Sequence, residues 1–201
     1  MTSVEPTPDL PAPGTPPTST SASPVPPSPT PTTAAPSSST PATTTPAASH
    51  TPDPSRPDDP AQAALFDAIA NENAVIFGYG IVSAHSSPEV NALVAEALLT
   101  HRTRREEALA LAAGQDSPAP LPAVGYQLPM AVDTPTDAAE LAVRMEQDSA
   151  AAWRAVLEQA TAEQTRRLAV PALTDSAVLA ARWRARLDRT PVTVAFPGGN
   201  E

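Results

Sequence analysis

Residues 61–80 read AQAALFDAIANENAVIFGYG, and the rest of the chain is organised around this stretch. Its apolar residues Leu65, Ile69, Ile76 and Tyr79 recur at the spacing of one helix face. Glu72 falls on the same face, between Ile69 and Ile76. A buried carboxylate costs several kcal/mol unless a partner compensates it. The stretch therefore predicts a helix whose interior glutamate needs a basic or hydrogen-bonding partner.

The first part of the chain differs in composition from the remainder. Of the 27 prolines, 18 lie at or before Pro60, and the other residues there are mostly Thr, Ser and Ala. Such a segment holds too few large apolar side chains to offset the conformational entropy lost on folding. We therefore predict a disordered Pro/Ser/Thr/Ala-rich tail over residues 1–59 and one domain over residues 60–201.

Composition also excludes several classes of protein and site. The chain has no cysteine, so disulfides and thiolate sites are excluded. A net charge of −10 without a run of Arg argues against nucleic-acid binding. No stretch approaches the ~18 apolar residues of a membrane span. The N-terminus MTSVEPTPDL lacks the basic and apolar regions of a signal peptide, which predicts a cytoplasmic protein, or an envelope protein if the true N-terminus is longer.

Capping residues predict where four helices begin. A polar residue followed by Pro is a helix-start signal, and it occurs at Asp59, Ser87 and Thr134. Thr161 with Gln164 has the spacing of a capping box and predicts the fourth start. Pro171 is expected to kink or interrupt that last helix. The predicted helices span about residues 61–85, 88–113, 135–160 and 161–187.

A long connection separates the second and third predicted helices. Residues 115–134 contain four prolines and no helical period. Extended, about 20 residues reach up to about 60 Å, whereas a helix of about 25 residues is only about 38 Å long. The segment can therefore cross a bundle from end to end. We predict an all-α, up-down four-helix bundle with one long crossover between helices two and three, the connectivity of ferritin-like bundles.

Four titratable residues fall near the middle of the four predicted helices. Glu72 precedes the connection between the first two predicted helices by about as many residues as His101 follows it. Because an α-helix rises ~1.5 Å per residue, the two residues lie at nearly the same height in this antiparallel pair. Glu146 and Asp175 lie near the middle of helices three and four. The spacing predicts their height but is less informative about their rotation around each helix axis.

Two interpretations of this central level remain open. The first is a metal site. A di-iron bundle needs Glu-x-x-His on two helices, but Leu98 stands where His101 would need a glutamate, and the fourth helix has no histidine. A single Fe or Mn ion held by Glu72, His101 and Glu146 remains as the alternative.

The second interpretation is a polar layer without a cofactor, in which histidine and arginine side chains pair with the buried carboxylates. Helix two offers Arg102, Arg104 and Arg105 beside His101. Arginine matches a carboxylate with two parallel hydrogen bonds. Such a layer sets helix register with little net gain in stability. We favour this interpretation.

The segments ANENAVIFGYG, LLTHRTRREEALA, PAVGYQLP, RMEQDSAAAWR and PVTVAFPG together resemble a bacterial ferritin-like domain family of unknown function. The resemblance covers about residues 61–199. It implies a ferritin-like four-helix bundle and no assigned activity. By matching motif it also implies a shared polar and aromatic centre, made of Glu72, His101, Arg102, Arg105, Tyr126, Glu146 and Trp183.

The sequence therefore favours a non-catalytic structural or binding module over an enzyme, with a protein partner or a second copy of the chain as the class of partner. The alternative is a metal-binding or oxidoreductase bundle that uses Glu72, His101 and Glu146. A missing Glu-x-x-His pair argues against iron oxidation or storage.

Overall fold

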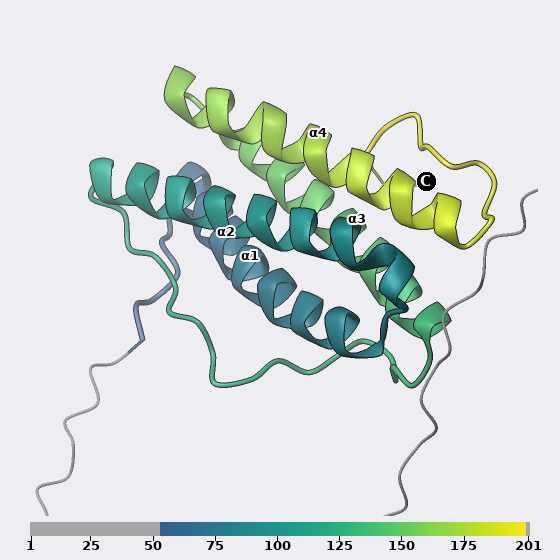
Figure 1. Ribbon diagram of the computed structural model, residues 1–201. Coiled ribbons are helices and arrows are strands. Elements are labelled where there is room, and N and C mark those ends of the chain that lie inside the picture. The colour runs from purple at the N-terminus through teal and green to yellow at the C-terminus, as the bar shows by residue number, and fades with distance from the viewer. Residues whose placement is uncertain (1–52, 200–201) are drawn as a thin grey trace, which may run out of the picture. The chain divides into compact units, whose positions relative to one another are not determined.

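A computed structural model describes residues 53–199 of the chain, and within them every regular element is helical (Figure 1). The four long helices are α1 (Pro60–His85), α2 (Asn91–Gly114), α3 (Pro135–Gln159) and α4 (Glu163–Arg186), and a short 3₁₀ turn, η1 (Pro88–Val90), precedes α2. The predicted all-α class with four helices is confirmed. No helix in residues 53–199 has the length and apolar character that a bilayer span requires.

Side-chain caps explain two of the helix starts. The carboxylate of Asp59 accepts hydrogen bonds from the backbone N–H groups of Ala61 and Gln62, at 3.1 and 2.9 Å. At α3, Thr134 and Asp137 form a reciprocal capping box, which satisfies two backbone N–H groups that a helix start leaves unpaired.

The fourth helix differs from the prediction at two points. It begins with Ala162 as its N-cap and without a side-chain cap, so the capping box expected at Thr161 is not formed. Pro171 lies inside α4, yet the helix continues from Glu163 to Arg186. Of the two outcomes expected at Pro171, a kink or an interruption, the interruption does not occur.

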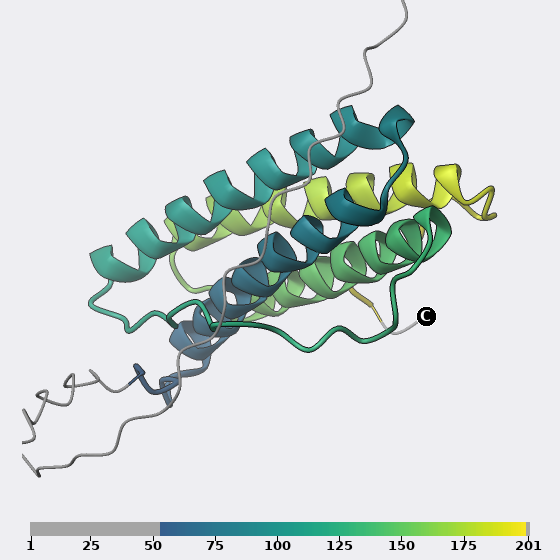
Figure 2. The same cartoon turned by 60° about the horizontal axis from the view of Figure 1, so that its bottom comes forward.

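The crossover, residues 115–134, runs along the outside of the bundle from the end of α2 to the start of α3 (Figures 1 and 2). Because it returns the chain to the opposite end, α3 runs parallel to α2 and antiparallel to α1. Leu128 and Met130 anchor it against the hydrophobic core. Four helices joined by two short connections and one long one thus match the predicted connectivity.

The buried side chains form two apolar clusters, one toward each end of the bundle. One cluster contains Val75, Tyr79, Leu141 and Trp183, and the other contains Leu65, Ile69, Trp153 and Ala169. On α1, Glu72 lies between the members of the two clusters. A polar layer therefore occupies the middle of the bundle between two hydrophobic ends.

Residues 53–59 lie in the segment assigned to the tail but contact the domain. The guanidinium of Arg56 pairs with the carboxylate of Asp67 in α1 at 2.7 Å. Asp53 accepts a hydrogen bond from the backbone N–H of Leu121 at 3.4 Å. The rest of the predicted tail, residues 1–52, lies outside the described residues.

Candidate functional site: a buried carboxylate–histidine–arginine layer

At the centre of the bundle, the ring of His101 lies between two glutamates. Its Nδ1 is 2.7 Å from Oε2 of Glu72, and its Nε2 is 3.0 Å from Oε1 of Glu146. All three side chains are fully buried. The residues come from α2, α1 and α3, so the histidine links three helices through one ring.

The second carboxylate oxygen of Glu72 is held by a cluster of donors. Trp153 Nε1 donates to Oε1 at 2.7 Å, and Ser149 Oγ and Arg104 Nη1 each lie 3.3 Å from the same atom. Arg104 Nη1 also donates to Ser176 Oγ of α4 at 2.8 Å. Glu72 is thus the residue on which contacts from α2, α3 and, through Arg104, α4 converge.

The other glutamate is bonded to an aromatic pair. Tyr79 donates its hydroxyl proton to Oε1 of Glu146 at 2.5 Å, and Trp183 Nε1 donates to the Tyr79 oxygen at 2.9 Å. The second oxygen of Glu146, Oε2, is buried and has no hydrogen-bond partner within residues 53–199.

Protonation of His101 balances the charge of the layer. Burial lowers the pKa of this imidazole, but hydrogen bonds to Glu146 and Glu72 outweigh burial and raise the pKa to about 9. His101 is therefore an imidazolium at neutral pH, with a proton on each ring nitrogen facing a carboxylate. The two cations, His101 and Arg104, then offset the two carboxylates, Glu72 and Glu146.

The same contacts perturb two further groups. Burial raises the pKa of the Glu72 carboxyl, but the hydrogen bond to His101, the nearby charges of His101 and Arg104 and the Trp153 N–H together lower it below its ordinary value. Burial and the neighbouring Glu146 carboxylate raise the pKa of Tyr79 well above its ordinary value. Glu72 is consequently ionised and Tyr79 remains a neutral donor at neutral pH.

The geometry of these residues does not fit the single metal ion considered from the sequence. Metal ligands must point at one common position. Glu72 and Glu146 instead approach opposite nitrogens of the imidazole, so the ring itself separates the carboxylates. Within residues 53–199, no group of three or more His, Cys, Asp or Glu side chains has an arrangement that could hold a metal ion.

Of the residues expected to form the centre, the structure brings together Glu72, His101, Glu146 and Trp183. Arg102 is exposed, and Arg105 is three-quarters buried but pairs with its neighbour Glu106 at 2.6 Å. The buried arginine is Arg104. Positions 104 and 105 lie on either side of His101 along the same general face of α2, about 100° apart. Arg104 lies on the side nearer α4, where it contacts Ser176 and Asp175.

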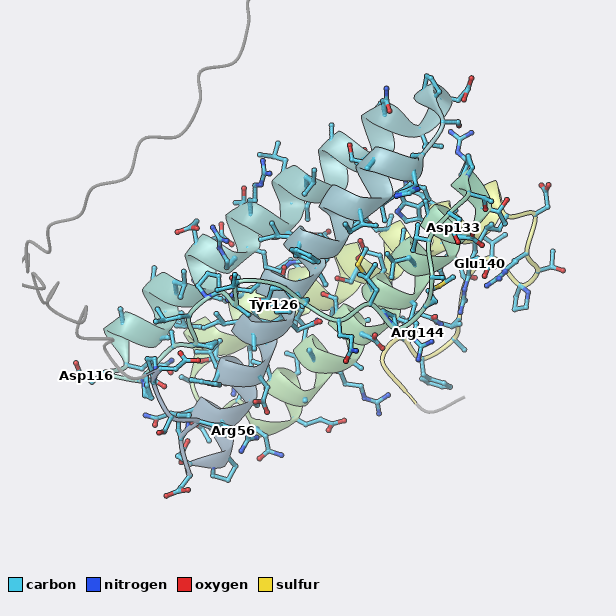
Figure 3. All side chains as sticks on the ribbon, turned by 90° about the horizontal axis from the view of Figure 1, so that it is seen from below. Arg56, Asp116, Tyr126, Asp133, Glu140 and Arg144 are labelled. Carbon is cyan, nitrogen blue, oxygen red and sulfur yellow. The ribbon has the colours of Figure 1, made fainter. Side chains whose placement is uncertain are left out.

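Tyr126, an expected member of the centre, and Asp175, expected only to share its height, both lie outside the layer. Tyr126 lies half-buried on the crossover (Figure 3), where its ring centre is 5.4 Å from that of Phe77 and its hydroxyl accepts a hydrogen bond from the backbone of Ala123. Asp175 shares the expected height, but its side chain is 55% exposed and lies 3.6 Å from Arg104 Nη2. The next residue, Ser176, takes the inward position on α4.

Sequence reasoning did not assign Tyr79, Ser176 or the indole N–H of Trp153 to the layer, and it named Arg104 only as one of three arginines beside His101. Helical spacing contained a signal for two of them. Tyr79 follows Glu72 by seven residues, and Trp153 follows Glu146 by seven, which places each pair on one helix face two turns apart. A hydrogen bond from an aromatic side chain cannot be read from periodicity, so the spacing alone does not place either residue in the layer.

Comparisons with known proteins agree with a domain that spans the folded part of the chain. The family model described as a domain of unknown function (DUF4439) matches residues 64–201. The chain is also similar to a conserved hypothetical protein, rv2844, from Mycobacterium tuberculosis, whose crystal structure has a TM-score of 0.63 and 52% sequence identity over 65% of this chain and 98% of that chain. Among curated proteins there is no match.

Proposed function

The chain belongs to the family described as a domain of unknown function, DUF4439, and we propose that this domain is a ferritin-like bundle acting as a non-catalytic structural or binding module. The ferritin-like assignment is supported by four helices of similar length with a single long crossover between the second and third. The resemblance of the sequence motifs supports the same assignment.

The observation that carries the non-catalytic proposal is the position of His101. Both of its ring nitrogens are engaged by carboxylates, at 2.7 and 3.0 Å. A histidine that binds a metal ion offers a ring nitrogen without a proton, and an imidazolium has none to offer. In a ferritin-like scaffold, the place of an inorganic centre is thus taken by an internal ion pair network.

The role of this layer is to determine how the helices fit together. Each of its charged groups has a partner on another helix, so a shift of one helix leaves a buried charge uncompensated. An unpaired buried charge costs about 3–5 kcal/mol. The layer therefore disfavours alternative registers while the two apolar clusters supply most of the stability.

Aerobic loading with Fe(II) and, separately, Mn(II) tests this proposal. After loosely bound ions are removed, we expect far less than one metal ion per chain. The reason is that the ring of His101 occupies the space between Glu72 and Glu146 in which a metal ion would have to sit. The measurement is the ratio of metal to protein, made on the wild type, on His101→Gln and on Glu107→Gln, an exposed carboxylate of α2 that serves as the control.

Stoichiometric metal in the wild type and in Glu107→Gln, but not in His101→Gln, would refute the proposal. That result would favour the metal-binding or oxidoreductase alternative that uses Glu72, His101 and Glu146. Metal that is retained equally in all three proteins would mean adventitious binding at the acidic surface.

A further inference from the structure

A pocket of about 960 Å³ lies between α3, α4 and the C-terminal segment, residues 191–199. Figure 1 shows this segment leaving the end of α4 and looping back beside the same helix. None of the residues that line the pocket belongs to the buried polar layer. Its size is within the range of small-molecule sites, about 300–1,000 Å³.

Small side chains on the two helices create this space. On α3, Ala150 and Ala151 line the pocket, and on α4, Ala177 and Ala181 line it one turn apart. The methyl group of an alanine fills little of the space between two packed helices. Leu173 of α4 also lines the pocket, so the surface between the helices is mainly aliphatic.

The backbone of the C-terminal segment approaches the backbone of α3 closely beside the pocket. Gly198 has a φ of +74°, and a Cβ atom at this position would lie 2.6 Å from the carbonyl oxygen of Ala150. Only glycine avoids that overlap and adopts this φ without strain. Val192 and Val194 of the same segment contribute apolar lining on the side away from the helices.

Two arginines that line the pocket lie toward one of its ends. Arg144 and Arg184 line it from the first half of α3 and the last turn of α4, and Figure 3 labels Arg144 near the C-terminal segment. Arg184 continues the face formed by Ala177 and Ala181, and within residues 53–199 no ion pair involves it. One acidic residue, Asp148, lines the pocket and interacts electrostatically with Arg144.

A third arginine is already committed to a partner. Arg182 makes a two-pronged ion pair with Glu96 of α2, at 2.5 and 2.8 Å. Arg144 and Arg184 therefore outnumber Asp148 among the charges available to a ligand. A local positive end is notable in a chain with a net charge of −10, because the protein as a whole repels anions.

We propose that this pocket binds a single-chain amphipathic anion of the fatty-acid class. The hydrocarbon chain lies along the alanine floor and beneath Val192 and Val194. The carboxylate lies at the end where Arg144 and Arg184 provide charge-assisted hydrogen bonds. This site is separate from the buried layer, so its test does not depend on whether the layer binds a metal.

Calorimetric titration of the full chain with laurate below its micellar concentration tests the proposal. We expect one laurate per chain, and an affinity at least about tenfold lower for the double variant Arg144→Gln/Arg184→Gln, since each lost bond is to a charged group. Arg186→Gln is the control, because it removes one positive charge from an exposed residue of α4 that does not line the pocket. Lauryl alcohol, which has the same chain without the charge, should bind at least about tenfold more weakly than laurate.

Filling the pocket provides a second, independent variant. Ala177→Phe should abolish laurate binding, and Ala181→Leu serves in its place if the circular dichroism spectrum shows that Ala177→Phe is misfolded. Binding that persists in the filled variant, or falls equally in Arg186→Gln, would overturn the proposal, as would no binding in the wild type. Equal affinity for laurate and lauryl alcohol would overturn the assignment of an anion.

Discussion

At the scale of single residues, His101 explains how a glutamate is tolerated inside α1. The ring bridges Glu72 and Glu146, and Arg104 supplies the second positive charge. Each charge in the layer has an opposite charge within hydrogen-bond distance, which is the condition under which a buried ion pair network is stable. The network also includes neutral donors, Trp153 and Tyr79, which occupy further lone pairs of the two carboxylates.

The protonation of His101 predicts how stability depends on pH. Its pKa is about 9 in the folded protein and 6.5 in the unfolded chain, so its contribution is complete below pH 6.5 and is lost as pH rises through about 9. The lowered pKa of Glu72 acts at the other end, because its contribution is complete above pH 4.5 and is lost as pH falls through the folded value. The layer is therefore most stabilising between pH 4.5 and 6.5.

We expect the free energy of unfolding to fall by roughly 3 kcal/mol between pH 6.5 and 9.5, from the difference between the two pKa values of His101. Urea unfolding across this pH range measures it. His101→Gln should be less stable at pH 6.5 and should lack this decline. His85→Gln, at the end of α1, should retain the decline and serves as the control. A wild-type curve that is flat over this range would show that His101 is neutral in the folded protein.

At the scale of helices, α4 is continuous despite Pro171. A proline inside a helix has no N–H for the carbonyl four residues earlier, here that of Arg167, and its ring crowds that carbonyl. The helix survives because its inward face is held by buried contacts before and after Pro171, at Ala169, Ala172 and Ser176. Tertiary packing thus overrides a local signal against the helix.

Pro171→Ala should stabilise the protein by about 1–3 kcal/mol, because it restores one backbone hydrogen bond and removes no buried side chain. Pro171 is exposed, so little packing is lost. The midpoint of urea unfolding at constant pH measures the effect. Pro122→Ala, an exposed position on the crossover, is the control and should not stabilise the protein. A lower midpoint for Pro171→Ala would show that the proline shapes α4 to fit its neighbours.

At the scale of the whole molecule, we propose that the folded domain begins near residue 53 rather than at residue 60. The contacts of Asp53 and Arg56 with the domain support this earlier boundary. Asp59, which caps α1, also precedes residue 60. The Pro-rich composition of the remaining N-terminal residues gives no reason to expect that they stabilise the domain.

A fragment of residues 53–201 should therefore unfold with the same thermal midpoint as the full chain. A fragment of residues 60–201 should be less stable by about 0.5–2 kcal/mol, since it lacks the Asp59 cap. Differential scanning calorimetry of the three proteins at equal concentration compares them. A full chain with a clearly higher midpoint than the longer fragment would show that residues 1–52 contribute to the fold.

The sequence by itself determined the four helices, the long crossover and the height at which Glu72, His101 and Glu146 meet. These features follow from capping residues, from prolines and from the helical rise of about 1.5 Å per residue. Each of these is a local property that can be read within a single segment of the chain. In the structure, hydrogen bonds through His101 link these three side chains, although each lies on a different helix.

Only the tertiary structure decided which side chains face each other at that level. Arg104 rather than Arg102 or Arg105 enters the layer, Ser176 rather than Asp175 is buried, and the indole N–H of Trp153 donates to Glu72. The rotation of a helix about its axis depends on how it packs against its neighbours, which a 3.6-residue period leaves undetermined within about a quarter turn. The pocket beneath the C-terminal segment has the same origin, because it is formed by two helices and a chain end that meet only in the folded domain.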